Sequence, residues 1–313
     1  MKTDRISINI LFFTYAFFCF TVSLPQSSAN CLDWIRYIVL NGALYLIYTA
    51  LLADNKNFKP LADFILLLYI IFLISAQAVK IWRYIKIYHG QTSAFSAVII
   101  TIFTLIILSV IEKEHIIQLS IPLFSAVIIL LLTVMLLNID KFNGLNLYAN
   151  KSVNPFLENI TLFDCAVPYI ITVKNIGKNT KKTAIFTIIC TTTAIILITI
   201  FCFMSVRGNL LYSLSPLQMV FQISSTTLIR NFDALYNLYV FFSYFRSLAL
   251  LLVSYKIIKA RFIYFNKTDL LLTAPFFVLL TSMDIPLGVI EFIVVIIMFF
   301  GRERKVYYEK TAG

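Results

Sequence analysis

Charged residues are scarce in this chain: they make up 13% of its 313 positions, whereas 60% of the positions are hydrophobic. A typical soluble domain is about one quarter charged, because its surface has to be solvated by water. This composition excludes a soluble enzyme or a soluble binding domain of the usual kind. We therefore expect lipid to be the solvent for most of the protein surface.

Glycine, cysteine and histidine are also few, with 8, 5 and 2 residues respectively. The chain has no phosphate-cradling glycine loop, no HExxH and no GxSxG motif, and it has neither a CxxC pair nor a Cys/His cluster. His89 and His115 fall in predicted loops near lysines, where we interpret them as solvated residues. The sequence therefore predicts no catalytic residues, no metal site and no cofactor, and hence a protein that is not an enzyme.

Basic residues outnumber acidic ones, so the formal net charge is +11. A nucleic-acid interface would gather this charge into one patch, but here the basic residues are scattered between apolar segments. This distribution is typical of topology signals and of contacts with anionic membrane lipids. We predict membrane lipids as partners, and no nucleic acid.

Long apolar runs are abundant, and several approach the roughly 20 residues that cross a bilayer as a helix. The strict alternation of a transmembrane β-barrel is absent. We predict an all-α polytopic membrane protein in which residues 1–313 form one transmembrane domain of ten helices. The predicted spans are 6–24, 35–53, 61–79, 94–111, 119–138, 160–174, 184–206, 232–255, 269–283 and 286–300.

The loop charges support this even number of spans. With the N-terminus inside, the inner segments carry 17 Lys and Arg residues and the outer segments carry 7, among them Lys80, Arg83 and Lys86. Cytoplasmic loops are enriched in these residues. We therefore predict that both ends are cytoplasmic, with 301–313 as a cytoplasmic tail.

The first 30 residues also have features of a secretory signal peptide. Lys2 and Arg5 precede an apolar run at 10–20, which is followed by "SSAN". However, the run continues as "FTVSLP", and another apolar span follows at once. We favour a first transmembrane helix over a cleaved signal.

Charged residues enter the predicted eighth span, in "TTLIRNFDALYNLYVFFSYFRSLALLLVSYK" at 226–256. Arg230 and Asp233 share a helix face at spacing i,i+3, which predicts a structural ion pair at the start of this span. Arg246 follows 13 residues later, about 20 Å deeper, where a charge requires a partner or water. Its candidate partners are Asp164 and Glu291, and a buried structural pair and a ligand or ion pathway both remain open for it.

The segment "NITLFDCAVPYIITVKN" at 159–175 contains Asp164 and Pro168 and is short for a span. A discontinuous helix explains these features, and transporters place substrates beside such breaks. As the sixth span, it opens a second half at about 160–300 that corresponds to a first half at about 6–138. The first opener likewise ends at a proline, Pro25, so we predict a five-plus-five inverted repeat.

The stretch "YSLSPLQMVFQISSTTLIRNFDALYNLYVFFSYFRSLALLLVSYKII" at 212–258 resembles the B subunits of bacterial spore germinant receptors, the endospore germination permeases. Two further stretches, 23–35 and 146–170, resemble the approaches to that family's second and sixth helices. Within 212–258 the residues that match the family pattern are Pro216, Arg230, Asp233, Ala234 and Arg246, with a lysine more usual at the last position.

The resemblance implies membership of the amino acid–polyamine–organocation (APC) superfamily and a LeuT-like fold. It also implies a subunit of the bacterial cell membrane or the spore inner membrane that works with an A and a C subunit. This subunit is expected to sense a small nutrient, such as an amino acid, in a midplane pocket. The residues expected to bind the ligand are Asp164, Arg246, Thr21, Ser23, Phe163 and Cys165.

The first predicted span departs from this pattern because it contains no glycine; the first glycine of the chain is Gly42. Unwinding a helix around a substrate generally uses glycine. This favours a sensor that binds without transport over a fast transporter. Two alternatives remain open: an APC-type secondary amino acid transporter, and a structural receptor subunit whose pocket has decayed.

Overall fold

The architecture comes from a computed structural model, and every regular element in its described residues is helical. Ten α-helices and one short 3-10 helix, η1, are present in this part of the chain. The described residues are 2–22, 31–53, 59–89, 94–110, 113–144, 147, 164–176, 180–205, 217, 220, 232–261, 273–282 and 287–301.

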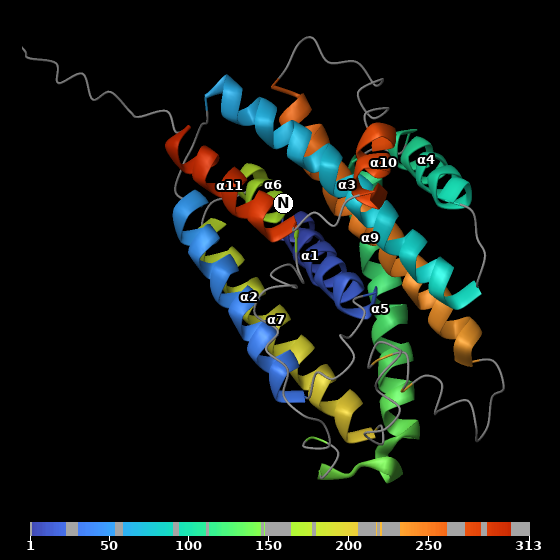
Figure 1. Ribbon diagram of the computed structural model, residues 1–313. Helices are drawn as coiled ribbons and strands as arrows, with labels where there is room; N and C mark the ends of the chain where they lie inside the picture. Colours follow the sequence, from blue (N-terminus) through green and yellow to red (C-terminus); the bar gives the residue numbers. More distant parts are fainter. Residues whose placement is uncertain are drawn as a thin grey trace, which may run out of the picture.

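The ten α-helices follow the ten predicted spans in order, one helix for each (Figure 1). Four of them contain segments long and apolar enough to cross a membrane, in α2, α3, α7 and α9. The protein is therefore a helical protein of membrane-embedded type. The helices are α1 Lys2–Val22, α2 Cys31–Leu52, α3 Pro60–His89, α4 Ala94–Val110, α5 Lys113–Leu137, α6 Ala166–Ile176, α7 Thr180–Ser205, α9 Phe232–Lys259, α10 Thr273–Ser282 and α11 Leu287–Phe300, with η1 at Ile139–Lys141.

Helix α3 is longer than the sequence predicts. It has 30 residues, or about 45 Å of helix. It runs without a break through residues 80–86, which the charge pattern assigns to an outer loop. The reason is that buried apolar residues such as Ile81 and Ile85 continue the helical spacing beyond Val79. Lys80 is consequently an interior residue of the helix rather than a loop residue.

Three of the ten helices are short. Helices α6, α10 and α11 have 11, 10 and 14 residues, or about 15–21 Å of helix, against a hydrocarbon layer of about 30 Å. The described part of α6 begins at Ala166, and its Pro168 occupies the first turn, where a missing N–H breaks no helical bond. Helix α1, in contrast, is continuous over 21 residues.

The bundle is built from helix pairs that are distant in the sequence (Figure 1). Helix α2 packs along α7, α3 packs along α9 and α10, and α1 packs against α5, α6 and α9. Aromatic side chains fill the α1–α9 contact, where the ring centroids of Phe17 and Tyr239 are 5.8 Å apart. The α2–α7 contact is close at Gly42, since a Cβ at this position would lie 2.7 Å from Oγ1 of Thr192.

Four helix ends meet at one end of the bundle. Nη1 of Arg261, just after α9, donates to both carboxylate oxygens of Asp63 in α3 at 3.0 and 3.1 Å. Nη2 of Arg261 donates to Oδ1 of Asn175 in α6 at 3.2 Å. The backbone N–H of Lys59 donates to the carbonyl of Gly301, after α11, at 2.8 Å. These contacts gather four connections that the charge pattern assigns to the same side of the membrane.

Replacing Arg261 by Ala is expected to lower the free energy of unfolding by about 1 kcal/mol, because partly exposed ion pairs contribute modestly. Asp63 would lose its cation and Asn175 a donor. Arg261→Lys is the matched control: it keeps the charge but cannot reach both acceptors, so we expect about half the loss. Thermal unfolding of the purified chain measures both. An unchanged midpoint in Arg261→Ala would show that this junction does not hold the helix ends.

Candidate functional site

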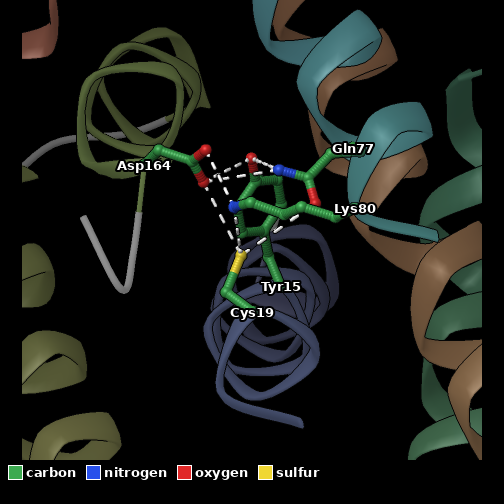
Figure 2. A network of polar contacts seen from close by, with 5 residues as sticks. All are labelled: Tyr15, Cys19, Gln77, Lys80 and Asp164. Carbon is green, nitrogen blue, oxygen red and sulfur yellow. Dashed lines mark hydrogen bonds and ion pairs between the residues drawn. The ribbon is translucent and has the colours of Figure 1, made fainter. Parts of the chain in front are cut away.

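Five polar side chains meet inside the bundle, between α1, α3 and the start of α6. Tyr15 and Cys19 come from α1, Gln77 and Lys80 from α3, and Asp164 lies two residues before α6. Figure 2 shows all five pointing toward one another, and we call them the polar cluster. Tyr15, Gln77 and Asp164 are fully buried, while the Lys80 side chain is 20% exposed.

The carboxylate of Asp164 is the centre of the polar cluster (Figure 2). Its Oδ2 accepts a hydrogen bond and ion pair from Nζ of Lys80 at 2.9 Å. Its Oδ1 accepts from Oη of Tyr15 at 3.0 Å, from Nε2 of Gln77 at 3.3 Å and from Sγ of Cys19 at 3.6 Å. A charge at this depth is tolerated only when it is paired and hydrogen-bonded, and Asp164 meets both conditions.

The other members of the polar cluster are also bonded to each other. Nε2 of Gln77 donates to Oη of Tyr15, and Nζ of Lys80 lies 3.3 Å from Sγ of Cys19. Local helix geometry aligns these donors, because Gln77 and Lys80 are three residues apart on α3, and Tyr15 and Cys19 are four apart on α1. Two helix faces therefore direct donors at one carboxylate.

A second buried carboxylate lies at the N-terminus of α6. Glu291, in α11, is 2% exposed, and its Oε1 accepts from the backbone N–H of Val167 at 3.4 Å. The positive end of a helix dipole favours an anion at this place, and the neighbouring carboxylate of Asp164 opposes a second one. Tyr45 and Tyr48 of α2 and Tyr69 of α3 lie within electrostatic range of Glu291.

The polar cluster is not at the end of the bundle where Arg261 binds Asp63. Lys80 follows Asp63 by 17 residues along α3, or about 26 Å, and precedes the end of α3 at His89 by about 14 Å. By the predicted topology this is the outer half of the protein. The polar cluster is thus a buried, charge-paired site in the half of α3 that is distant from the contact between Arg261 and Asp63.

The predicted site residues have different outcomes. Asp164 and Cys165 are both fully buried at the start of α6. Arg246 is 2% exposed and lies in α9 with its guanidinium carbon 5.7 Å from the centroid of the Phe124 ring. Of the two carboxylates predicted as candidate partners of Arg246, Asp164 pairs with Lys80, and Glu291 accepts a hydrogen bond from the N–H of Val167 in α6. The side chains of Thr21, Ser23, Phe163, Arg230 and Asp233 lie outside the described residues.

Four members of the polar cluster are not predicted by the sequence: Tyr15, Cys19, Gln77 and Lys80. Gln77 and Lys80 interrupt a long apolar run at i,i+3 spacing, and this pattern is the signal that could have found them. With the third span predicted to end at 79, Lys80 falls in a loop, so its i,i+3 spacing from Gln77 is not recognised as one face of a helix. For Tyr15 no comparable signal exists, because tyrosine is common in membrane helices.

The chemistry available at the polar cluster is recognition by charge and hydrogen bonding. No group of three His, Cys, Asp or Glu side chains in the described part of the chain could hold a metal ion. The cluster instead presents one ammonium and one carboxylate in contact, with three neutral hydrogen-bonding groups around them.

Neither protein-family models nor curated proteins match the chain. The resemblance within 212–258 and the geometry of the polar cluster are then the observations that bear on function.

Proposed function

We propose that this chain is the permease-like subunit of a spore germinant receptor, and that it binds a small zwitterionic nutrient at the polar cluster. The buried ion pair between Lys80 and Asp164, placed where α1, α3 and the short helix α6 meet, is the observation that carries the proposal. The motif in 212–258 supports the family, and the distribution of loop charge supports cytoplasmic termini. Partner A and C subunits in the spore inner membrane would receive the signal.

The ion pair is suited to exchange with a zwitterion. The carboxylate of an amino acid would take the place of Asp164 beside Lys80, and its ammonium group would take the place of Lys80 beside Asp164. Each buried charge then keeps a partner, so the exchange avoids the cost of leaving an unpaired ion in a low dielectric. The exchange would also release Asp164, at the start of α6, from the side chains of α1 and α3.

Release of that contact gives a route from binding to signal. With the pair formed, Asp164 ties the α6 segment to Lys80 of α3 and to Tyr15 of α1. A ligand that binds the separated charges more tightly than the closed arrangement shifts the population toward the separated state. Partner subunits that contact the shifted helices would then detect occupancy.

The helix pairs support a five-plus-five arrangement. Counted as spans, the second packs with the seventh (α2 and α7), the third with the eighth (α3 and α9), and the first with the sixth (α1 and α6). The third span also packs with the ninth, α10, and the eighth span packs with the fourth, α4. These two contacts correspond to each other, because in a five-plus-five repeat the third span is equivalent to the eighth and the fourth to the ninth. In transporters built from inverted repeats the two halves meet at an interface that holds the site, so this packing supports the proposal.

The same pairs favour the alternative of an APC-type secondary transporter. Against it stands α1, which has no glycine and no break between Lys2 and Val22, so it offers no unwound backbone to a substrate. A structural subunit with a decayed pocket is the third possibility, because the polar cluster satisfies itself without a ligand.

Binding of radiolabelled amino acids to the full chain in lipid nanodiscs tests the proposal. We expect saturable binding to the wild type and at least a tenfold loss in the double variant Lys80→Met/Asp164→Asn, which removes both charges together. Asp140→Asn, at an exposed carboxylate in η1, is the matched control and should bind as the wild type does.

Three other results would each contradict one part of the proposal. Ligand accumulation inside proteoliposomes would indicate a transporter. Intact assembly with A and C subunits without any ligand binding would indicate a structural subunit. Equal affinity in the wild type and the double variant would place the ligand away from the polar cluster.

A further inference from the structure

Glu291 is a buried carboxylate without a counter-cation among the described residues. Its side chain is 2% exposed, and its contact is with the first turn of α6 through the N–H of Val167 at 3.4 Å. Lys80, the one described cation that interacts electrostatically with it, is bound to Asp164 at 2.9 Å. The site around the start of α6 thus holds two carboxylates and one ammonium group.

The described groups that interact electrostatically with Glu291 belong to α2, α3 and the segment before α6, and Lys80 is the one cation among them. They are Tyr45 and Tyr48 of α2, Tyr69 and Lys80 of α3, and Asp164 and Cys165 before α6. An ionised Glu291 would leave this buried site with an excess negative charge.

A buried hydroxyl group, that of Tyr69, interacts electrostatically with this carboxyl group without being hydrogen-bonded to it. Oη of Tyr69 is buried and has no hydrogen-bond partner in the described part of the structure, and Tyr69 is 3% exposed. A buried polar atom without a partner is costly, so a donor or acceptor is expected to occupy its surroundings. A protonated carboxyl group supplies a donor that an ionised carboxylate lacks.

We propose that Glu291 binds one proton at neutral pH and that this proton is the ion coupled to ligand occupancy. Oε1 accepts the N–H of Val167, and the proton, taken from water, is bonded to Oε2. The neutral carboxyl group removes the excess negative charge beside Asp164. A proton also needs no cavity, whereas a hydrated or dehydrated metal ion does.

The inference deepens the proposed function and rests on it for one step only, the coupling to ligand. Loss of the proton would place a second negative charge near Lys80. Lys80 would then be shared between Glu291 and Asp164, and its availability to a ligand carboxylate would fall. Ligand affinity at the polar cluster is therefore expected to decrease as the pH rises.

Infrared spectroscopy of the full chain in nanodiscs tests the protonation without any ligand. At neutral pH exposed carboxyl groups are ionised, so a protonated-carboxyl C=O band should arise from Glu291. Glu291→Gln should remove the band, and the double variant Lys80→Met/Asp164→Asn should retain it. Absence of the band from the wild type would overturn the proposal, and so would its loss in the double variant.

The pH dependence of unfolding is a second test that also needs no ligand. A proton bound by the folded chain and lost on unfolding raises the unfolding equilibrium constant up to tenfold per pH unit as the pH rises. We expect this dependence in the wild type and in the control Asp140→Asn, and a weaker dependence in Glu291→Gln. Equal dependence in all three would contradict the proposal.

Saturable stabilisation of the wild type by sodium or potassium at fixed pH would also overturn it, in favour of a metal cation. These ligand-free measurements are independent of nutrient binding. If no nutrient binds but the infrared band of the protonated Glu291 is present, the proposed function alone is rejected. If nutrient binds but this band is absent, the proton site alone is rejected.

Discussion

Replacing Lys80 by Met is expected to destabilise the protein by about 3–5 kcal/mol, because it leaves the carboxylate of Asp164 buried without its cation. Asp164 is fully buried and Lys80 is its ion-pair partner at 2.9 Å. Methionine has nearly the same length as lysine, so the packing of α3 against α1 is retained and the charge is the main change. Thermal or denaturant unfolding in matched nanodiscs measures the loss.

The double variant Lys80→Met/Asp164→Asn separates charge from packing. With both charges removed, most of the stability should return, because a neutral pair of similar volume carries no desolvation penalty of an ion. The amide oxygen introduced by Asp164→Asn would still accept from Tyr15 and Gln77 in place of the carboxylate. A double variant as unstable as Lys80→Met alone would show that the unpaired charge of Asp164 is not the source of the instability.

Replacing Gly42 by Ala is expected to cost about 1–3 kcal/mol, as overpacking of a close helix contact does. The new Cβ would lie 2.7 Å from Oγ1 and 2.9 Å from Cγ2 of Thr192, so α2 and α7 would have to separate. The higher helix propensity of alanine acts in the opposite direction by about 0.5–1 kcal/mol. The change in unfolding midpoint reports the net effect.

Two variants control this experiment. Thr192→Ala removes both atoms that would clash, so Gly42→Ala/Thr192→Ala should be at least as stable as Thr192→Ala alone. Gly144→Ala should have little effect, because no atom lies within 4 Å of a Cβ at that position. If Gly42→Ala is as stable as the wild type, α2 and α7 are not in the close contact seen here.

The boundaries of the helices were less predictable than their order. The predicted spans match ten described helices one for one, because apolar runs and polar connections are local features. The end of α3 was misplaced by ten residues, at 79 instead of His89, since Lys80 was interpreted as a loop residue. A basic residue inside a span is unexpected unless its partner is known, and the partner of Lys80 is 84 positions away in the chain.

The position of Arg246 illustrates the same limit. Its burial followed from its depth in an apolar segment, and the structure agrees, at 2% exposure. The group that Arg246 contacts could not be predicted from the sequence. Whether its guanidinium lies near Asp164, Glu291 or an aromatic ring depends on how α9 is rotated against α1 and α5. The structure places it over Phe124.

The amino-acid sequence by itself indicated lipid as the solvent of the protein surface, and it determined the helical class and the order of the helices. These features follow from composition and from the spacing of apolar residues along one segment. Only the tertiary structure decided which charges meet. Lys80, Asp164 and Glu291 belong to three distant segments, and their proximity depends on how α3, α6 and α11 pack around α1 and α2. Side-chain spacing along one helix defines a face, but the partner of that face is a property of the whole bundle.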